Sequence, residues 1–289
     1  MTDYSDDNLE RAELLLDSLT VYFPELLPRL NVVVPGNQSA LVKRRISCFG
    51  VRIIDEEEFI PDLKRFRKQD GWRKQMVIKL AAAAQSSEPF CLTLDADLVC
   101  LRPMVPNLLV ENGRALFQPC PNDIPPNHFG WYRDSAKLLG FKMQRGDIVG
   151  SVTPAILASK IVLALIEHLQ VRHSMPWVRL LMKVAAHNLP DRLPFLRRLN
   201  WSEYALYNTF SMTKGLHNLH HGPCLGTGES PNLISPDSLW WKEEIPNWSA
   251  AKFFKNQGKS VFGVVQSNTR ISAAMVRAGF SPFLIRPPT

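Results

Sequence analysis

Helical and strand-like patterns alternate along the first hundred residues, and this alternation constrains the fold more than any other feature. Apolar residues recur at helical spacing over residues 7–19, and residues 71–85 form a second helical segment. Short apolar runs typical of buried strands lie at residues 31–35, 51–55 and 90–97. Such alternation predicts an α/β fold with a mainly parallel central sheet flanked by helices.

The second half of the chain continues the mixture. Strands are expected at residues 115–119 and 260–266, and helices at residues 155–171, 202–213 and 271–278. Ser202 is a natural N-cap for the helix that follows it. Because no obvious linker interrupts these segments, we expect a single domain over residues 1–289.

Composition excludes several classes of protein. The hydrophobic fraction of 45% and the charged fraction of 21% are those of a globular protein, not of a disordered or fibrous one. The acidic N-terminus resembles no secretory signal, and no apolar run approaches the length of a membrane span, so a cytoplasmic protein is expected. The five cysteines contain no C-x-x-C pair, which argues against a disulfide framework or a structural zinc site.

The chain carries 34 Lys and Arg residues against 27 Asp and Glu residues, a formal charge of +7. No nucleic-acid-binding motif accompanies this charge, so no nucleic acid partner is expected. A nucleotide diphosphate or an anionic membrane face suits the basic clusters better. Residues 175–199 combine apolar and basic side chains and predict a peripheral contact with the inner face of a membrane. The alternative is an ordinary pair of amphipathic helices that cover the core.

Two aspartates, Asp95 and Asp97, end the apolar run at residues 90–94. Carboxylates one residue apart point to the same face of a continuing strand, whereas a turn would splay them. Mg²⁺ and Mn²⁺ prefer oxygen ligands, and Mg²⁺ typically takes one or two carboxylates together with substrate phosphates and water. Apolar residues on both sides of the pair favour a functional site over a helix cap on a solvated loop.

The same residues also fit the start of a phosphatase motif in which Asp95 would be the nucleophile. That motif normally lies on the first strand of its domain, and no acidic pair follows a later strand to complete its magnesium site. The phosphatase therefore remains the weaker alternative.

A longer pattern makes the aspartate pair more specific. Residues 71–80 read Gly-Trp-x-x-Gln-x-x-x-Lys-Leu, and residues 92–98 read Leu-Thr-Leu-Asp-Ala-Asp-Leu. Together they resemble bacterial GT-A glycosyltransferase-like proteins, which carry such a helix before an Asp-x-Asp strand. The likeness extends through residues 153–154, 202–207 and 266–268, so it covers most of the chain.

The resemblance implies a single GT-A domain in which residues 1–130 bind a nucleotide sugar and residues 131–289 bind the acceptor. It implies a metal-dependent hexosyltransferase of cell-envelope polysaccharide synthesis, with Mn²⁺ or Mg²⁺ as cofactor and a glycan or lipid-linked acceptor. GT-A domains usually open with a strand, whereas this sequence reaches its first helix almost at once. A protein that binds nucleotides or carbohydrates without turnover is therefore a second hypothesis.

The resemblance also assigns roles to residues. Asp97 would be the principal metal ligand, and Asp95 would contact the ribose or the metal. Gln75 and Lys79 lie one helical turn apart and could present an amide and an ammonium to the donor, although a solvated Lys79 is equally compatible with the sequence.

Two further assignments concern the C-terminal half. Glu203 resembles the catalytic acidic residue that deprotonates the acceptor hydroxyl, but acidic residues also favour helix N-termini for structural reasons. His221, in the cluster His217, His220 and His221, would supply the last metal ligand; the alternative is a surface histidine, because this spacing matches no closed zinc set.

Overall fold

The computed structural model describes residues 6–119, 126–142, 150, 153–184, 199–224, 230–255 and 259–284. The α-helices are α1 (Asp6–Tyr22), α2 (Ser39–Ile46), α3 (Glu56–Phe59), α4 (Gly71–Gln85), α5 (Pro126–Leu139), α6 (Ser159–His173), α7 (Trp177–Val184), α8 (Glu203–Thr213), α9 (His217–His220), α10 (Ala250–Lys255) and α11 (Ala273–Phe280). The strands are β1 (Asn31–Val34), β2 (Arg52–Asp55), β3 (Phe90–Thr93), β4 (Leu98–Cys100), β5 (Val110–Glu111), β6 (Arg114–Phe117), β7 (Ala155–Ala158), β8 (His221–Pro223), β9 (Asn232–Ile234) and β10 (Ser260–Val264).

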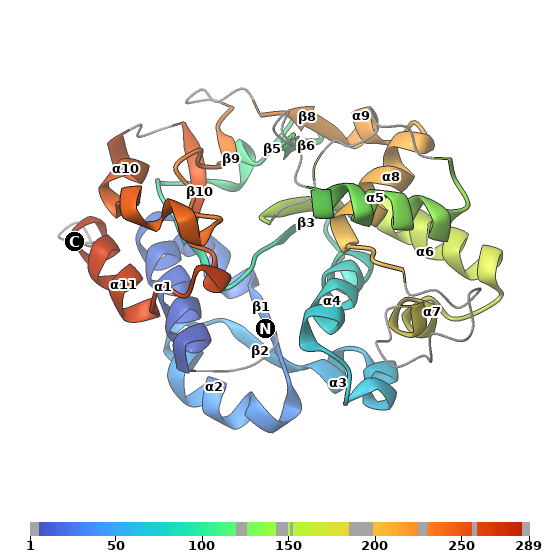
Figure 1. The fold of residues 1–289 in the computed structure, drawn as a ribbon, viewed down its shortest axis with the longest axis horizontal. Coiled ribbons are helices and arrows are strands. Elements are labelled where there is room, and N and C mark those ends of the chain that lie inside the picture. Colours follow the sequence, from blue (N-terminus) through green and yellow to red (C-terminus); the bar gives the residue numbers. More distant parts are fainter. Residues whose placement is uncertain are drawn as a thin grey trace.

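The predicted mainly parallel central sheet is wrong. The described strands form four small sheets, in the orders β2-β1, β7-β3, β4-β10-β9 and β5-β6-β8. Three pairings are parallel, but β3 with β7, β4 with β10 and β5 with β6 are antiparallel. Helices, with the 3₁₀ segments included, take up 59% of the residues that the structure describes. The GT-A sheet is therefore not observed, and the fold is a helix-rich mixture of short sheets (Figure 1).

The reason for this difference lies partly in one misassigned segment. Residues 155–158, Ala-Ile-Leu-Ala, were expected to begin a helix because alanine and leucine favour helices. They instead form β7, whose four residues pair in register with β3, and the helix begins at Ser159. Tertiary pairing thus overrides local propensity, and it makes β3 part of an antiparallel pair.

Most other segments match their predictions. The expected helices at residues 7–19, 71–85, 202–213 and 271–278 correspond to α1, α4, α8 and α11, and the expected strands near residues 31, 51 and 260 correspond to β1, β2 and β10. The predicted 90–97 strand is shorter, because β3 ends at Thr93 and the chain turns before β4. No helix among the described residues has both the length and the apolar character needed to cross a membrane.

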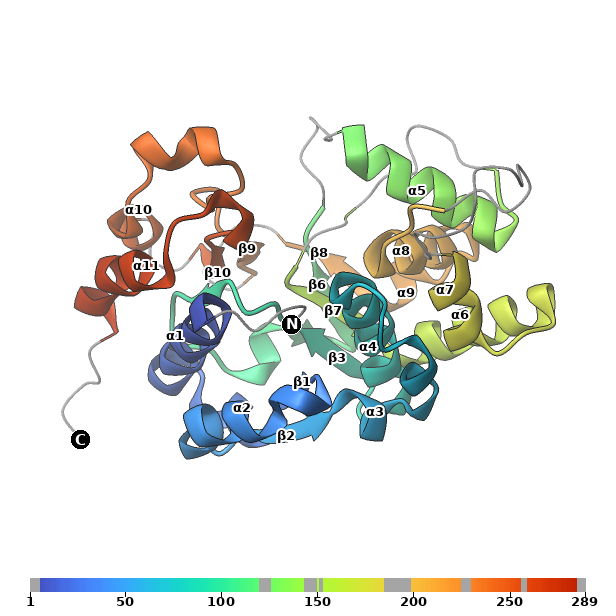
Figure 2. The same ribbon diagram turned by 60° about the horizontal axis from the view of Figure 1, so that its bottom comes forward.

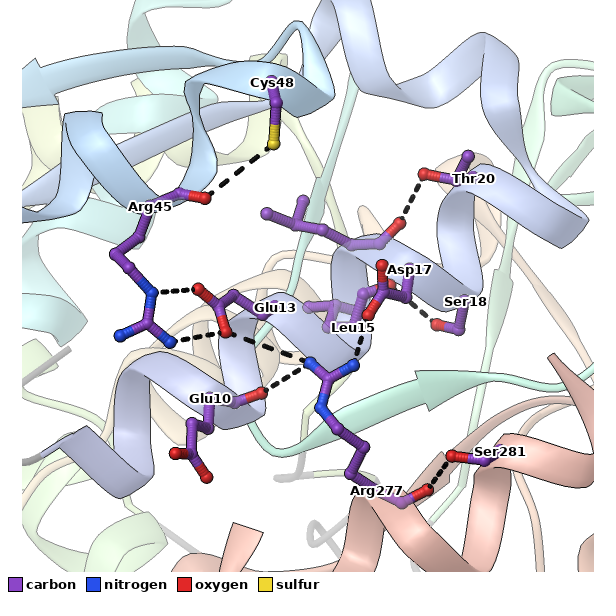
Figure 3. A network of polar contacts seen from close by, with 11 residues as sticks. Glu10, Glu13, Leu15, Asp17, Ser18, Thr20, Arg45, Cys48, Arg277 and Ser281 are labelled. Atoms are coloured by element: carbon purple, nitrogen blue, oxygen red, sulfur yellow. Dashed lines mark hydrogen bonds and ion pairs between the residues drawn. The ribbon is translucent and has the colours of Figure 1, made fainter. Parts of the chain in front are cut away.

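Helix α1 is held to neighbours that are distant in sequence (Figure 3). Arg45 on α2 pairs with Glu13, with Nε and Oε1 2.6 Å apart. Arg277 on α11 pairs with Asp17 at 2.6 Å and donates to the carbonyl oxygen of Glu10. The first and last helices of the chain are therefore side by side, as both views of the ribbon show (Figures 1 and 2).

Candidate functional site around a buried lysine

The two predicted aspartates lie in the turn between β3 and β4. Strand β3 pairs with β7, whereas β4 pairs with β10, so this turn carries the chain from one sheet to another. The two carboxylates of this turn contact different parts of the protein. Asp95 pairs with α4, whereas Asp97 accepts a hydrogen bond from the segment that follows β10. The splaying that the sequence left open is therefore observed.

Lys79 is the centre of the site. Its Nζ lies 2.7 Å from Oδ1 of Asp95 and 2.9 Å from Oε1 of Glu203, and the residue is 9% exposed. Burial by itself lowers the pKa of Lys79, but the carboxylates of Asp95 and Glu203 outweigh this effect and raise the pKa well above its usual value. Lys79 is therefore a charged ammonium shared by two carboxylates and not a solvated surface side chain.

The helix N-terminus of α8 supplies Glu203. Ser202 caps this helix, because its hydroxyl accepts a hydrogen bond from the backbone N–H of Ala205 at 3.1 Å. The cap fixes the first turn of α8, where Glu203 is 4% exposed. The predicted residue thus joins the site, with its carboxylate on Lys79.

Thr93 and Tyr204 also belong to the site, although the sequence analysis did not single them out. The hydroxyl of Thr93 donates to the carbonyl oxygen of Ala155 at 2.9 Å and lies 3.0 Å from the hydroxyl of Tyr204. The Tyr204 ring also lies under the Lys79 ammonium, with Nζ 5.0 Å from the ring centroid. Tyr204 directly follows Glu203 in the segment that carries the family resemblance. This position next to a predicted site residue could have identified Tyr204 from the sequence.

Asp97 faces the other way. Its Oδ2 accepts a hydrogen bond from the backbone N–H of Ser267 at 3.1 Å, and its own carbonyl oxygen accepts from Val265 at 3.0 Å. Burial and the nearby charge of Asp95 raise the pKa of Asp97 to about 6, although the Ser267 hydrogen bond acts in the opposite direction. Asp97 therefore changes its protonation state close to neutral pH.

Gln75 lies one turn before Lys79 on α4 and is partly exposed. Both residues line a cavity of about 1000 Å³, and Asp95 lies at the same cavity wall. The predicted face of α4 is thus directed toward an open space next to the aspartate turn.

His221 does not join the aspartates. It lies in β8, where its Nε2 is 2.7 Å from the hydroxyl of Tyr207 and its ring packs on His217 and Phe117. Burial lowers the pKa of His221 to about 3, so the ring is neutral. Among the described residues no three His, Cys, Asp or Glu side chains gather as a metal site, and the set Asp95, Asp97 and His221 is therefore not assembled.

Of the two carboxylates in the turn, only Asp97 is not already paired with Lys79, so the protein offers few ligands to a divalent cation. Asp97 is a hard oxygen ligand held by one backbone amide, whereas Asp95 is already paired with Lys79. Mg²⁺ binds commonly through one or two carboxylates plus phosphate and water. The donor set therefore suits a cation delivered with a phosphorylated ligand and not a closed protein cage.

The segment proposed for membrane contact is described only in part. In α7 the apolar residues Val178, Leu180, Leu181 and Met182 are buried and pack in the core. Residues 185–198 lie outside the described part of the chain. The described part of residues 175–199 thus behaves as a core-covering amphipathic helix.

The fold and the site define a helix-rich protein with short parallel and antiparallel strand pairs and a buried ammonium shared by two carboxylates beside an Asp-x-Asp turn. Residues 1–286 match a family described as a family of unknown function, DUF6492, and the chain belongs to this family. No curated protein matches the sequence.

Proposed function

We propose that this protein is a metal-dependent glycosyltransferase that takes a sugar from a nucleotide donor to a glycan or lipid-linked acceptor. The observation that carries the proposal is the turn at Asp95 and Asp97, which is held by Lys79 on one side and by Ser267 on the other. A Mn²⁺ or Mg²⁺ ion bound at this turn would supply Lewis-acid stabilisation of the departing nucleoside diphosphate.

The charge of the site supports this assignment. Asp95 and Glu203 share the Lys79 ammonium, and Asp97 in the same turn faces Ser267, so an ionised Asp97 adds a third carboxylate to a site with one ammonium. Asp97 accepts the Ser267 amide with Oδ2, and its carboxylate would hold the cation. Gln75 lies on the cavity wall and would contact the donor from α4.

The role of Glu203 is revised from the sequence expectation. Its carboxylate is buried, and its Oε1 is engaged with Lys79 at 2.9 Å. A general base needs contact with the proton that it removes, and a base paired with an ammonium is weakened. We therefore assign Glu203 as a positioning residue that holds Lys79 against Asp95.

The test is donor binding with and without metal. Thermal unfolding is measured with a panel of UDP-, GDP- and dTDP-sugars, each in the presence of Mn²⁺ or of EDTA, because a ligand that binds the native state raises its apparent stability. At least one donor should raise Tm only when Mn²⁺ is present. Calorimetry and product analysis with that donor then measure affinity and transfer.

Matched variants locate the effect. Asp97→Asn keeps the shape and the Ser267 hydrogen bond but removes the charge, and it should abolish the metal-dependent shift. Asp62→Asn makes the same change on the 3₁₀ segment Pro61–Phe66, away from the cavity, and should leave the shift unchanged. A metal-dependent shift that survives in Asp97→Asn would show that the site is assigned wrongly.

A nucleotide-sugar-binding protein without turnover is the second candidate. The burial of Glu203 favours it, because the described site then offers no free carboxylate base beside the aspartate turn. Metal-dependent binding without product over long incubation would select this candidate. Covalent phosphate on Asp95 after incubation with a phosphate ester would instead support the phosphatase alternative.

A further inference from the structure

Three aromatic rings are in contact where the first turns of α4 and α5 meet. The rings of Trp72 on α4 and Trp131 on α5 have their centroids 6.1 Å apart and are tilted by 42°. The imidazole of His128 stacks on the Trp131 indole, with centroids 4.6 Å apart and an angle of 22° between the planes. All three residues are partly exposed, and the neighbouring Phe129 is 40% exposed. Trp72, His128 and Trp131 thus form one aromatic platform that solvent reaches.

The aromatic platform continues the wall of the candidate site. Trp72, Gln75 and Lys79 are three and four positions apart on α4, so they share one face of the helix. Lys79 pairs with Glu203 on this face, and Trp72 lies about 10 Å further along the helix axis. Helix α5, which carries the rest of the platform, packs against α8, which begins with Glu203. Both ribbon views place α4, α5 and α8 in the same half of the molecule (Figures 1 and 2).

The surroundings of Trp72 hold the aromatic platform in place. Asp70 caps α4 and accepts a hydrogen bond from the backbone N–H of Trp72 at 3.0 Å. The guanidinium of Arg73 lies over the Trp72 ring, 4.5 Å from its centroid, and donates to Oδ1 of Asn200 at 3.0 Å. Asp134 on α5 accepts from the backbone N–H of Asn200 at 2.9 Å, so both helices are tied to the same residue. Rings that are held in this way lose little conformational freedom when a ligand binds.

Polar groups beside the aromatic platform have no partner inside the part of the protein that the structure describes. There, neither the indole N–H of Trp72 nor that of Trp131 makes a hydrogen bond, and the side-chain amide of Gln75 makes none. Burial lowers the pKa of His128, so its ring is neutral near neutral pH. The guanidinium of Arg73 repels a second cation from the Trp72 ring. The platform therefore offers aromatic faces together with uncharged hydrogen-bonding groups.

An uncharged oligosaccharide matches this surface. Each sugar ring has a face of C–H groups, which packs on aromatic rings, and an edge of hydroxyls, which pairs with N–H and amide groups. Successive sugars of a chain are tilted relative to one another, as the rings of Trp72 and Trp131 are. A planar nucleobase, in contrast, would lie flat on only one of these two rings.

We infer that the aromatic platform is an acceptor subsite that binds an uncharged oligosaccharide, with Gln75 contacting the hydroxyls of the sugar nearest to Lys79. The inference rests on the proposed glycosyltransferase function and names the class of its acceptor, because the platform recognises the glycan itself and not a lipid carrier. The acceptor chain lies along α4 with its terminal sugar toward Lys79. Trp72, His128 and Trp131 are thus binding residues and take no part in proton transfer.

The experiment measures oligosaccharide binding to the 289-residue chain by calorimetry, without nucleotide or metal. The probes are maltopentaose, cellopentaose, laminaripentaose and chitopentaose, with uridine and guanosine as planar alternatives. Trp131→Ala removes the central ring, and Trp131→Phe keeps a smaller ring there. Trp241→Ala is the matched control, because Trp241 is 47% exposed and follows Leu239, which pairs with Val265 beyond β10. Melting temperatures establish that each variant is folded.

At least one oligosaccharide should bind, and Trp131→Ala should weaken this binding by about 10-fold or more, because a central tryptophan commonly dominates a binding surface. Trp131→Phe should lose less affinity, and Trp241→Ala should lose none. The inference is overturned if no oligosaccharide binds, if Trp131→Ala binds as tightly as the wild type, if Trp241→Ala loses as much affinity, or if only the nucleosides bind.

The metal-dependent donor assay tests the proposed function separately. A protein that binds oligosaccharides through Trp131 but binds no nucleotide sugar would contradict the proposed function and leave the carbohydrate subsite standing. A protein that binds a nucleotide sugar with Mn²⁺ but binds no oligosaccharide would contradict the subsite alone.

Discussion

At the scale of single residues, Lys79 is the side chain on which the site depends. Replacement by Met keeps the length of the side chain but leaves Glu203 buried without its cation. Breaking a buried ion pair from one side typically costs about 3–5 kcal/mol, and the partial exposure of Asp95 places the expected loss toward the lower end. Urea unfolding at neutral pH measures this loss in the free energy of unfolding.

A double variant separates the loss of charge balance from a loss of packing. Lys79→Met with Glu203→Gln removes one carboxylate together with the ammonium, and it should recover part of the stability that Lys79→Met loses. A double variant no more stable than the single one would show that the ammonium acts through packing on Tyr204 and not through the carboxylates.

The raised pKa of Asp97 predicts how the stability of the protein depends on pH. Its pKa is about 6 in the folded protein against an ordinary value of 3.8, so folding favours the protonated form. The contribution of Asp97 to stability is fully present below pH 4 and is lost as the pH rises through 6. Asp97→Asn resembles the protonated form, and at pH 7.5 without metal it should be more stable than the wild type by about 1–3 kcal/mol.

The difference between the two proteins should vanish below about pH 3, where Asp97 is protonated in both the folded and the unfolded state. Denaturant titrations from about pH 3 to 8 measure it. A gap that is independent of pH would mean that Asp97 has an ordinary pKa. Metal binding to Asp97 needs the ionised carboxylate, so Mn²⁺ affinity should weaken as the pH falls below 6.

At the scale of elements, the N-cap of α8 positions part of the site. Ser202 is 3% exposed and accepts the hydrogen bond from Ala205. Ser202→Ala should lower the free energy of unfolding by about 1 kcal/mol, and Ser202→Asp should retain more of the cap. Because Glu203 begins the capped turn, the alanine variant should also weaken donor binding, whereas Ser272→Ala, at the N-cap of α11, should affect stability alone.

Because the strands are short, the sequence predicted the long helices better than the pairing of the strands. Periodicity located α1, α4 and α8 because long helices repeat their apolar pattern several times. Strands of two to five residues carry too little pattern to reveal their partners. The pairing of β3 with β7 joins residues more than sixty positions apart, and the local preference of residues 155–158 was helical.

At the scale of the whole molecule, Arg11 fastens the N-terminal helix to the C-terminal segment. The Arg11 residue is 2% exposed, and its guanidinium donates to the backbone carbonyls of Val265 and Ile271 and pairs with Asp7. Arg11→Met leaves two buried carbonyl oxygens without this donor, and we expect a loss of about 3 kcal/mol or more. Arg45→Met, which removes an exposed pair with Glu13, should cost less than about 1 kcal/mol.

Unfolding curves of the two variants give the comparison directly. Similar losses in the two variants would indicate that the buried contacts of Arg11 contribute no more to stability than the exposed pair of Arg45 with Glu13. Since Arg11 lies next to the segment that holds Asp97, its loss should also increase proteolysis near residues 265–271 in the native state.

The amino-acid sequence by itself indicated helices α1, α4, α8 and α11, the Asp95 and Asp97 pair at the end of an apolar run, the Ser202 cap and the candidate residues Lys79 and Glu203. These follow from periodicity, capping chemistry and local spacing, which are properties of neighbouring residues. Only the tertiary structure decided that Lys79 is a buried ammonium between two carboxylates, that His221 belongs to another cluster, and that β1 and β3 line the same cavity. Each of these depends on contacts between segments far apart in the chain, because burial and electrostatics are set by packing and not by local pattern.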